Sequence, residues 1–408
     1  MQSGPAAKDR AGNRAFPEAG WYADPCSPKR LPIRRNNGDL ELQREVRPSI
    51  RDRGMERGPQ LGSRGYLRKR GNDGSGTAWP QGPGSATMGV PLASTTDCEA
   101  ARVQILRQPV PVSPNGVCLA LGMFDGVHLG HQHVIRQALL DARTFGARSV
   151  VATFDPHPLA VVRPEQAPRL LQPPGQRLAE IARLGADAAL VLRFDAEFSR
   201  RTGERFVRDL AEGFVRIRSF TVGEGFSFGH GRSGDVPLLR RLGAELGFEV
   251  HAMAPIQIGD AVVSSTRVRA ALRDGELGLV AELIGRPYAV SGTVVEGDRI
   301  GRTLGFPTAN LEVAGLELPP PGVYAVRARH PGGEHPSALN IGFRPTLRSG
   351  VPELRFEVHL IGFDGDLYGA NVEVEFVRRM RGEIRFDGLE ALKARIAQDV
   401  REVAALLS

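Results

Sequence analysis

The hydrophobic pattern of the chain changes near residue 285, and this change limits the folds that the chain can adopt. Before that point, apolar runs such as VCLAL (117–121) alternate with stretches of helical spacing such as HQHVIRQALLDARTFG (131–146). After it, segments such as GVYAVRARH (322–330) and NVEVEFV (371–377) alternate polar and apolar residues between Gly, Pro and Asp turns. Strands that alternate with helices predict a doubly wound, Rossmann-like parallel sheet, and the later strands predict a small antiparallel barrel.

Two helical segments accompany the predicted barrel. The periodicity of residues 268–285 predicts a helical bridge that leads into the barrel. Residues 389–407 close the chain as an amphipathic helix. The stripe expected to pack on the barrel consists of Leu389, Leu392, Ile396 and Val400.

The N-terminal part of the chain differs from both halves in composition. Residues 1–87 are rich in Gly, Pro, Arg and Ser, and their apolar residues form no periodic face. Such a composition is typical of a disordered, low-complexity extension. We therefore predict an extension over 1–103, one domain over 104–284 and a second over 285–408. Met88 lies close to the start of periodic sequence, and we expect the natural start there.

The positive net charge of +7 belongs to the extension. Residues 1–87 contain 16 of the 53 lysines and arginines and 9 of the 46 acidic residues, so the other 321 residues carry 37 of each. A folded part with balanced charge has no overall field to attract polyanions. No nucleic-acid partner is expected from it, although a basic nucleic-acid arm in the extension stays open as an alternative.

Apolar runs and cysteines indicate the compartment. No run of about 18 apolar residues suggests a membrane helix, so no membrane partner is expected. Cys26, Cys98 and Cys118 form no CxxC pair and no zinc spacing. This usage is typical of the reducing cytoplasm. The sequence does not indicate an oligomeric state.

The segment GMFDGVHLGHQ (122–132) joins a predicted strand to a predicted helix. A glycine turn at the carboxyl edge of a parallel sheet gathers backbone N–H groups and a helix N-terminus, which suits a phosphate. It is neither a Walker loop nor GxGxxG. His128 and His131 suit hydrogen bonds to a phosphate that develops charge. A metal pair would need a third ligand, and a structural pair without a ligand is the other alternative.

The turn resembles the signature of the nucleotidylyltransferase superfamily, in the form found in bacterial bifunctional riboflavin kinase/FAD synthetases. TFDPHP (153–158) and VSSTRVR (263–269) resemble two further motifs of that family, in the family's order. The resemblance implies transfer of AMP from ATP to FMN, giving FAD and pyrophosphate, with His128 and His131 as catalytic residues. It implies a nucleotide-binding set of Gly122, Phe124, Asp125, Gly126, Gly130, Ser265, Thr266, Arg267 and Arg269.

The flavin side of this site follows from the same resemblance, which places Asp155, His157 and Phe226 there. The segment GEGFSFGHGRSGD (223–235) resembles the family's flavin-side loop, but Gly225 stands where an Asp or Asn is usual. Either this departure weakens FMN binding or Glu224 substitutes. Read alone, SSTRVR favours a helix N-cap followed by surface arginines.

The second half resembles riboflavin kinase in GRPY (285–288), GFPTAN (305–310) and NIGFRPT (340–346). A glycine-bearing loop that runs into Thr and Asn suits phosphate and Mg²⁺, which prefers oxygen ligands. The resemblance implies that Thr308 and Asn310 bind Mg²⁺ and ATP. Nucleotide binding would also involve Gly301 and Gly305, with Glu357 as the base toward the ribityl hydroxyl of riboflavin. Read alone, PTAN is a capped turn and Glu357 an outward-facing strand residue.

The sequence as a whole predicts a cytoplasmic enzyme with two activities. Riboflavin and ATP would give FMN, and FMN and ATP would give FAD, with Mg²⁺ in both steps. One alternative is a kinase whose adenylyltransferase half has decayed at Gly225. Another is a flavin-binding regulator whose basic extension contacts nucleic acid.

Overall fold

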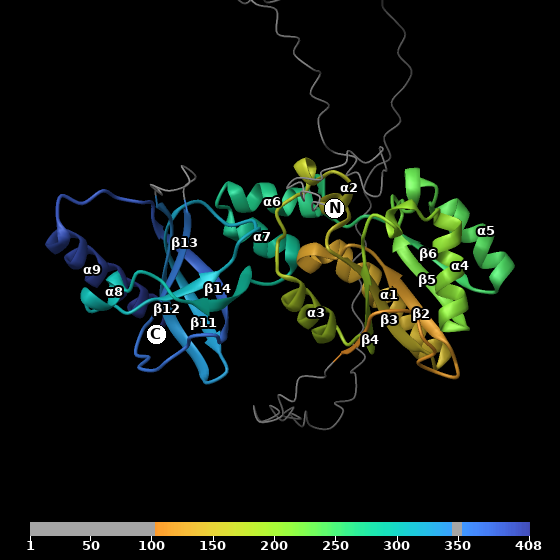
Figure 1. Ribbon diagram of the computed structural model, residues 1–408, viewed down its shortest axis with the longest axis horizontal. Helices are drawn as coiled ribbons and strands as arrows, with labels where there is room; N and C mark the ends of the chain where they lie inside the picture. The colour runs from red at the N-terminus through yellow and green to blue at the C-terminus, as the bar shows by residue number, and fades with distance from the viewer. Residues whose placement is uncertain (1–102, 345–352) are drawn as a thin grey trace, which may run out of the picture. The chain divides into compact units, whose positions relative to one another are not determined.

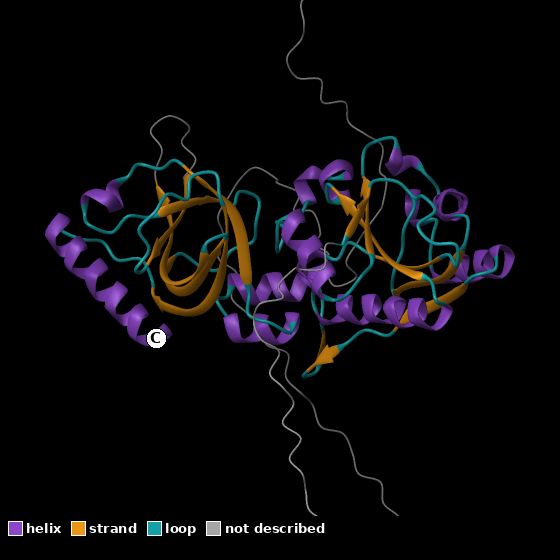
Figure 2. Cartoon of the chain, turned by 90° about the horizontal axis from the view of Figure 1, so that it is seen from below, coloured by secondary structure: helices purple, strands orange, loops and turns teal. Residues whose placement is uncertain are grey.

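The computed structural model of the protein describes residues 103–344 and 353–408 (Figures 1 and 2). The predicted extension, apart from residue 103, and the expected start at Met88 lie outside the described residues.

A six-stranded sheet forms the first half, in the order β1-β4-β3-β2-β5-β6. Every neighbouring pair in it is parallel, which confirms the expected doubly wound sheet. Its four inner strands, β2 to β5, are mostly apolar and buried, as expected for strands covered on both faces, whereas the edge strands β1 and β6 are more exposed. The strands span Gln104–Leu106 (β1), Val117–Leu121 (β2), Arg148–Asp155 (β3), Ala188–Arg193 (β4), Ile217–Gly223 (β5) and Glu249–Met253 (β6).

Helices cover both faces of this sheet (Figure 1). Along β2, Ala120 packs on one face and Leu119 and Leu121 on the other. The face of Ala120 packs against α1 and α3, and the opposite face packs against α4 and α5. These helices span Leu129–Phe145 (α1), Pro174–Arg183 (α3), Gly203–Phe214 (α4) and Val236–Leu246 (α5), and a short helix, Pro158–Val162 (α2), follows β3.

The predicted helical bridge over 268–285 is two helices rather than one. A small hairpin of Gln257–Ile258 (β7) and Ala261–Val262 (β8) leads into Ser265–Arg273 (α6), and Leu277–Ile284 (α7) follows. Gly275, with φ of +78°, ends α6, and its N–H donates to the carbonyl of Leu272. Glycine adopts this left-handed conformation without steric cost, so it interrupts an otherwise periodic sequence.

A closed six-stranded antiparallel barrel forms the second half, as predicted, in the order β10-β13-β12-β11-β14-β9. Figure 2 shows its strands curving around a common interior. Alternate residues of each strand fill that interior, for example Phe356, Val358 and Leu360. The strands span Ala289–Val295 (β9), Ala309–Glu312 (β10), Gly322–His330 (β11), Gly333–Arg344 (β12), Glu353–Leu360 (β13) and Asn371–Arg381 (β14).

Two helices belong to the barrel half, Ile300–Thr303 (α8) and Leu389–Leu407 (α9). Helix α9 packs on Ala325 of β11 through Val403 and Leu407. The predicted stripe is wrong at its start, because Leu389 is 64% exposed. The apolar contact lies instead at the C-terminal end of the helix. Within the described parts of the chain, no helix has the length and apolar character to cross a membrane.

Candidate active sites

The glycine turn follows β2 at the point where the strand order of the sheet reverses. β2 lies between β3 and β5, and the carboxyl ends of strands at such a reversal are the usual ligand position of open α/β sheets. The backbone here has positive φ at Phe124 (52°), Gly126 (79°) and Val127 (39°). A β-branched residue rarely adopts this conformation, and strain of this kind clusters at functional sites. A side chain at Gly126 would place its Cβ 2.6 Å from Leu171 Cδ1.

The carbonyl groups of the turn are held by the protein. Each carbonyl oxygen from Met123 to Val127 accepts a hydrogen bond. Thr153 Oγ1 donates to Met123 O at 2.9 Å, and Ser265 Oγ donates to Asp125 O at 3.2 Å. Carbonyl oxygens carry partial negative charge and would repel a phosphate if they were directed at it. With these carbonyls bound within the protein, the start of α1 is the feature of this region that suits an anion.

His128 and His131 lie together at the N-terminus of α1. Their rings stack with centroids 3.6 Å apart, and the edge of Phe124 packs on His131 at 5.3 Å. His128 caps the helix, since its Nδ1 accepts the N–H of His131 at 3.3 Å. The proton of the neutral His128 ring is therefore on Nε2, which makes this nitrogen a donor.

Burial keeps the histidines of the site neutral. It lowers the pKa of His128 to about 3, and the charges of Arg269 and Arg286 add to the shift. Burial also lowers the pKa of His131 well below its usual value, and that of His157 to about 4. A neutral imidazole still donates one hydrogen bond, so the pair can bind phosphate oxygens without carrying charge of its own.

Helix α6 brings the SSTRVR motif to the same turn. Ser264 caps the helix by accepting the N–H of Arg267 at 3.2 Å, as in the N-cap interpretation of the motif. Arg267 donates to the carbonyls of Ile258 and Ala261, so it ties the β7–β8 hairpin to the helix. Thr266 lies half-buried on the same first turn.

Arg269 is buried in the site rather than on the surface. Its Nη2 lies 2.5 Å from Asp125 Oδ2, and its Nε donates to the carbonyl of Arg169 at 2.7 Å. Asp125 also accepts the N–H of Leu171. Two residues expected to bind nucleotide thus bind each other, and their pair joins α6 to the turn.

On the flavin side, the structure places Asp155 at the end of β3 and His157 at the start of α2. His157 Nδ1 accepts the N–H of Leu159 at 3.2 Å, so the ring caps the helix. Phe226 follows β5 and stacks on Phe228 with centroids 5.5 Å apart.

The packing around position 225 does not require a glycine. A Cβ built at Gly225 meets no atom within 4 Å, and Glu224 is exposed beside it. The usual Asp or Asn would therefore fit at this position without steric conflict.

Arg177 of α3 belongs to the site and was missed in the sequence. It is 2% exposed, and its Nη1 and Nη2 donate to the carbonyls of Met123 and Phe154 at 3.2 and 3.1 Å. It therefore holds the ends of β2 and β3 together and places a positive charge under the turn. Arg177 lies one helical turn before the buried Ile181, so the two residues share one face of α3. An arginine on the apolar face of a helix was the sequence signal that could have indicated its buried position.

The candidate kinase residues meet on the outer face of the barrel. Glu357 of β13 lies opposite Asn310 of β10 and opposite Asn340 of β12. Residues directly opposite each other in neighbouring strands share a face, so the three side chains form one polar row. Since Phe356 and Val358 fill the interior, Glu357 faces outward, as in the alternative interpretation. Asn340 was not among the predicted site residues.

The segment before β10 folds against this row. Side chains at Gly297 and Gly301 would overlap Asn310 and the carbonyl of Phe306, and Thr308 lies against Gly301. His359 Nδ1 lies 2.7 Å from the carbonyl of Pro307, which joins the segment to β13. Gly305, with φ of +88°, makes the turn that precedes Thr308. Hydroxyl, amide and carboxylate oxygens thus gather beside a glycine-bearing loop.

Comparison with known proteins agrees with both sites. An FAD synthetase family model matches residues 110–267, and a riboflavin kinase family model matches residues 284–407. The bifunctional riboflavin kinase/FMN adenylyltransferase of Escherichia coli (strain K12) is 40% identical over 70% of this chain and 90% of its own. The protein of the same name from Bacillus subtilis (strain 168) is 34% identical over 71% of this chain and 92% of its own.

A solved structure described as a macrolide-efflux protein from Streptococcus pneumoniae is also similar. It aligns with a TM-score of 0.64 and 28% identity over 74% of this chain and 99% of that one. Efflux is the description of that protein, and neither family model matched here concerns it. The chain belongs to the bifunctional riboflavin kinase/FMN adenylyltransferase family, and it makes FMN from riboflavin and ATP and FAD from FMN and ATP.

Proposed function

We propose that FAD forms at the turn after β2, with His128 and His131 as neutral hydrogen-bond donors to the phosphates of ATP. The observation that carries this proposal is the stacked, uncharged pair at the N-terminus of a 17-residue helix. The phosphate of FMN attacks the α-phosphorus of ATP and pyrophosphate leaves, so the protein has to position the two groups and stabilise charge. Both tasks suit the pair.

The residues around the pair complete the nucleotide site. Gly122, Phe124, Gly126 and Gly130 shape the turn, and Ser265 and Thr266 at the start of α6 lie beside it. Arg269 and Asp125 hold α6 against the turn through their ion pair, and the charge of Arg269 acts on the phosphates at short range. Arg267 supports the same helix from the hairpin. FMN enters on the side of Asp155, His157 and Phe226.

We assign riboflavin phosphorylation to the outer face of the barrel. Glu357 accepts the proton of the ribityl hydroxyl as that oxygen attacks the γ-phosphorus of ATP, and ADP leaves as the bond to the β–γ bridging oxygen breaks. Gly301 and Gly305 let the segment before β10 approach the nucleotide closely. Thr308 and Asn310 supply a hydroxyl and an amide oxygen, which fit Mg²⁺ bound with ATP. The ion would neutralise the charge on the phosphates in this step and in adenylyl transfer.

The setting of the enzyme follows from composition. We assign adenylyl transfer to residues 104–284 and the kinase to residues 285–408, in the cytoplasm. The balanced charge beyond residue 87 and the absence of paired cysteine motifs support this assignment. Small molecules are the partners of the folded part, namely riboflavin, FMN and ATP.

Two variants of the full chain test the assignment of the sites. His131→Ala should lower FAD formation from FMN by about 100-fold or more and leave FMN formation intact, because it removes a donor to developing charge. Glu357→Gln should do the reverse when riboflavin is supplied. Chromatography of the flavins separates the two steps. His133→Ala, on the helix beyond the pair, is the matched control. Equal loss of both activities in either variant would refute the two-site assignment.

A further inference from the structure

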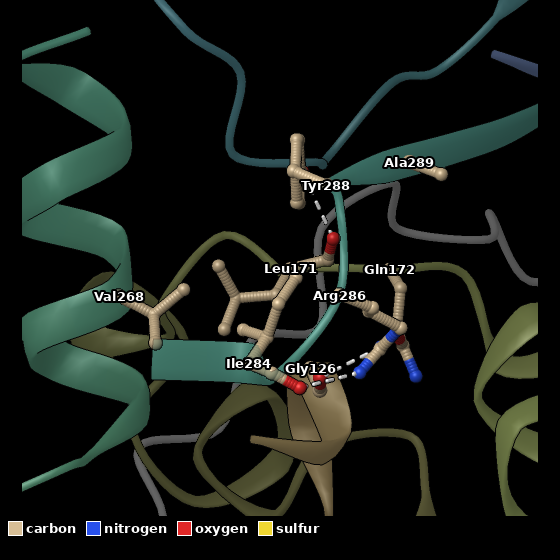
Figure 3. Close-up of a pocket in the computed structure, with 8 residues that line it drawn as sticks. All are labelled: Gly126, Leu171, Gln172, Val268, Ile284, Arg286, Tyr288 and Ala289. Atoms are coloured by element: carbon tan, nitrogen blue, oxygen red, sulfur yellow. Dashed lines mark hydrogen bonds between the residues drawn. The ribbon is translucent and has the colours of Figure 1, made fainter. Parts of the chain in front are cut away.

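Arg286 follows the end of α7 and reaches back to the glycine turn. Its Nη2 donates to the carbonyl of Gly126 at 3.0 Å, and its Nη1 donates to the carbonyl of Val127 at 3.2 Å. The same Nη1 also donates to the carbonyl of Ile284 at 3.1 Å. Figure 3 shows the guanidinium beside Gly126 and Ile284 at a small cavity that Tyr288 also lines.

The two carbonyls from the turn belong to its strained part. Gly126 and Val127 both have positive φ, and Val127 is β-branched. Such a conformation persists only where the surroundings hold it. The fork of Arg286 grips two consecutive peptide groups of this part, immediately before His128.

A second donor acts on the same carbonyls from α1. Gln132 Nε2 donates to Val127 O at 3.0 Å and to Ile284 O at 2.8 Å. Arg286 and Gln132 thus share two acceptors, and together they tie the turn, the start of α1 and the end of α7. Gln132 follows His131 directly, so this network borders both catalytic histidines.

The guanidinium of Arg286 also lies near a carboxylate. Its Nε lies 3.3 Å from Glu180 Oε1, but that carboxylate is also bound by Arg183. Burial is the main cause of the lowered pKa of His128, and the charge of Arg286 adds to it. Arg286 lies in the segment that matches the riboflavin kinase model (284–407), yet its guanidinium bonds to the nucleotide turn of the other half.

We propose that Arg286 is a positioning residue for adenylyl transfer. By holding the carbonyls of Gly126 and Val127, it keeps two partial negative charges away from the ATP phosphates and fixes the position of His128. It does not touch the substrate, so its loss should act mainly on kcat for FAD formation. The inference rests on the proposed assignment of adenylyl transfer to His128 and His131.

The test uses full-length Arg286→Ala and Arg286→Lys, with Arg183→Ala as the matched control. Both arginines bind Glu180, but Arg183 makes no hydrogen bond to the turn among the described residues. We expect Arg286→Ala to lower kcat for FAD formation by about 10- to 100-fold, because small misplacements of reacting groups have effects of that size. The KM for FMN and the rate of riboflavin phosphorylation should stay within about twofold of the wild type.

Two further measurements separate positioning from folding. Arg286→Lys keeps the charge but not the fork, so we expect it to lose about tenfold in FAD formation with riboflavin phosphorylation intact. Methylguanidinium in solution should restore part of the FAD formation of Arg286→Ala and none of that of His131→Ala. If Arg286→Ala does not fold, the lysine variant decides the question alone.

Three results would overturn the inference. They are wild-type FAD formation in Arg286→Ala, wild-type FAD formation in Arg286→Lys, and parallel loss of both activities in Arg286→Lys. If Arg286→Ala loses activity as expected but His131→Ala keeps it, the assignment of the histidines fails instead. If His131→Ala loses FAD formation and both Arg286 variants keep it, the role of Arg286 is rejected and the assignment of the histidines stands.

Discussion

At the scale of single residues, the site depends on uncharged imidazoles next to fixed positive charge. Burial is the main cause of the lowered pKa values of His128 and His131, and the nearby charges of Arg269, Arg177 and Arg286 add to it. The arginines stay charged because a guanidinium group is not deprotonated in proteins. In the proposed site, the histidines would therefore act as hydrogen-bond donors, and the arginines would supply the electrostatic attraction for phosphate.

The lowered pKa of His128 predicts a pH-dependent stability. In the unfolded chain the ring takes up a proton near pH 6.5, but in the folded protein only near pH 3. Its contribution is therefore complete above about pH 6.5 and falls as the pH drops toward 3, by about 2 kcal/mol at pH 5. Thermal melting at pH 7.5 and 5 should show a smaller loss for His128→Asn than for the wild type. Identical losses in both proteins would contradict the prediction.

At the scale of elements, the segment between β9 and β10 packs against the candidate kinase residues. Its glycines let the backbone pack directly on the residues that are to bind ATP and Mg²⁺. Gly301 lies against the carbonyl of Phe306 and the side chain of Thr308, and Gly297 lies against Asn310. The N–H of Phe306 also donates to the carbonyl of Gly301 at 2.8 Å.

This packing predicts a selective defect for Gly301→Ala. The new methyl group would overlap the Phe306 carbonyl and displace Thr308, so we expect riboflavin phosphorylation to fall by about tenfold or more. FAD formation from FMN should remain within about twofold of the wild type. Gly388→Ala is the control, because a Cβ there meets no atom within 4 Å. Unchanged phosphorylation in Gly301→Ala would show that the segment does not bind the nucleotide.

At the scale of the whole molecule, the product of one activity is the substrate of the other. With the proposed assignment of the sites, FMN made on the barrel has to reach the turn after β2, in the same chain or in another one. Because the two candidate sites use different residues on different sheets, we expect each variant that loses one activity to keep the other.

A mixture of His131→Ala and Glu357→Gln chains should therefore convert riboflavin and ATP to FAD, although neither variant does so alone. The expected time course has a lag while free FMN accumulates, and added FMN should remove the lag. Chromatography of the flavins over time measures both. Lack of FAD in the mixture, with both single activities present, would mean that FMN does not leave the chain that makes it.

Much of the fold was readable in the sequence, and the errors have local causes. The strands over 117–121 and 322–330 occur as predicted, because their periodicity and turn residues agree. The bridge over 268–285 is helical as predicted, but its division into two helices was not predicted, since the positive φ of Gly275 leaves no trace in the apolar pattern. The stripe of the last helix was placed too early because periodicity does not show how far the partner strand extends.

The sequence by itself determined the two kinds of sheet, the turn with its histidine pair and the chemical types of the site residues. Only the tertiary structure showed that Arg269 pairs with Asp125, that Arg177 joins two strand ends, and that Arg286 holds the turn. The physical reason is that these contacts join residues distant in the chain. Hydrophobic periodicity reports which face of an element is buried, whereas packing of whole elements decides which buried groups meet.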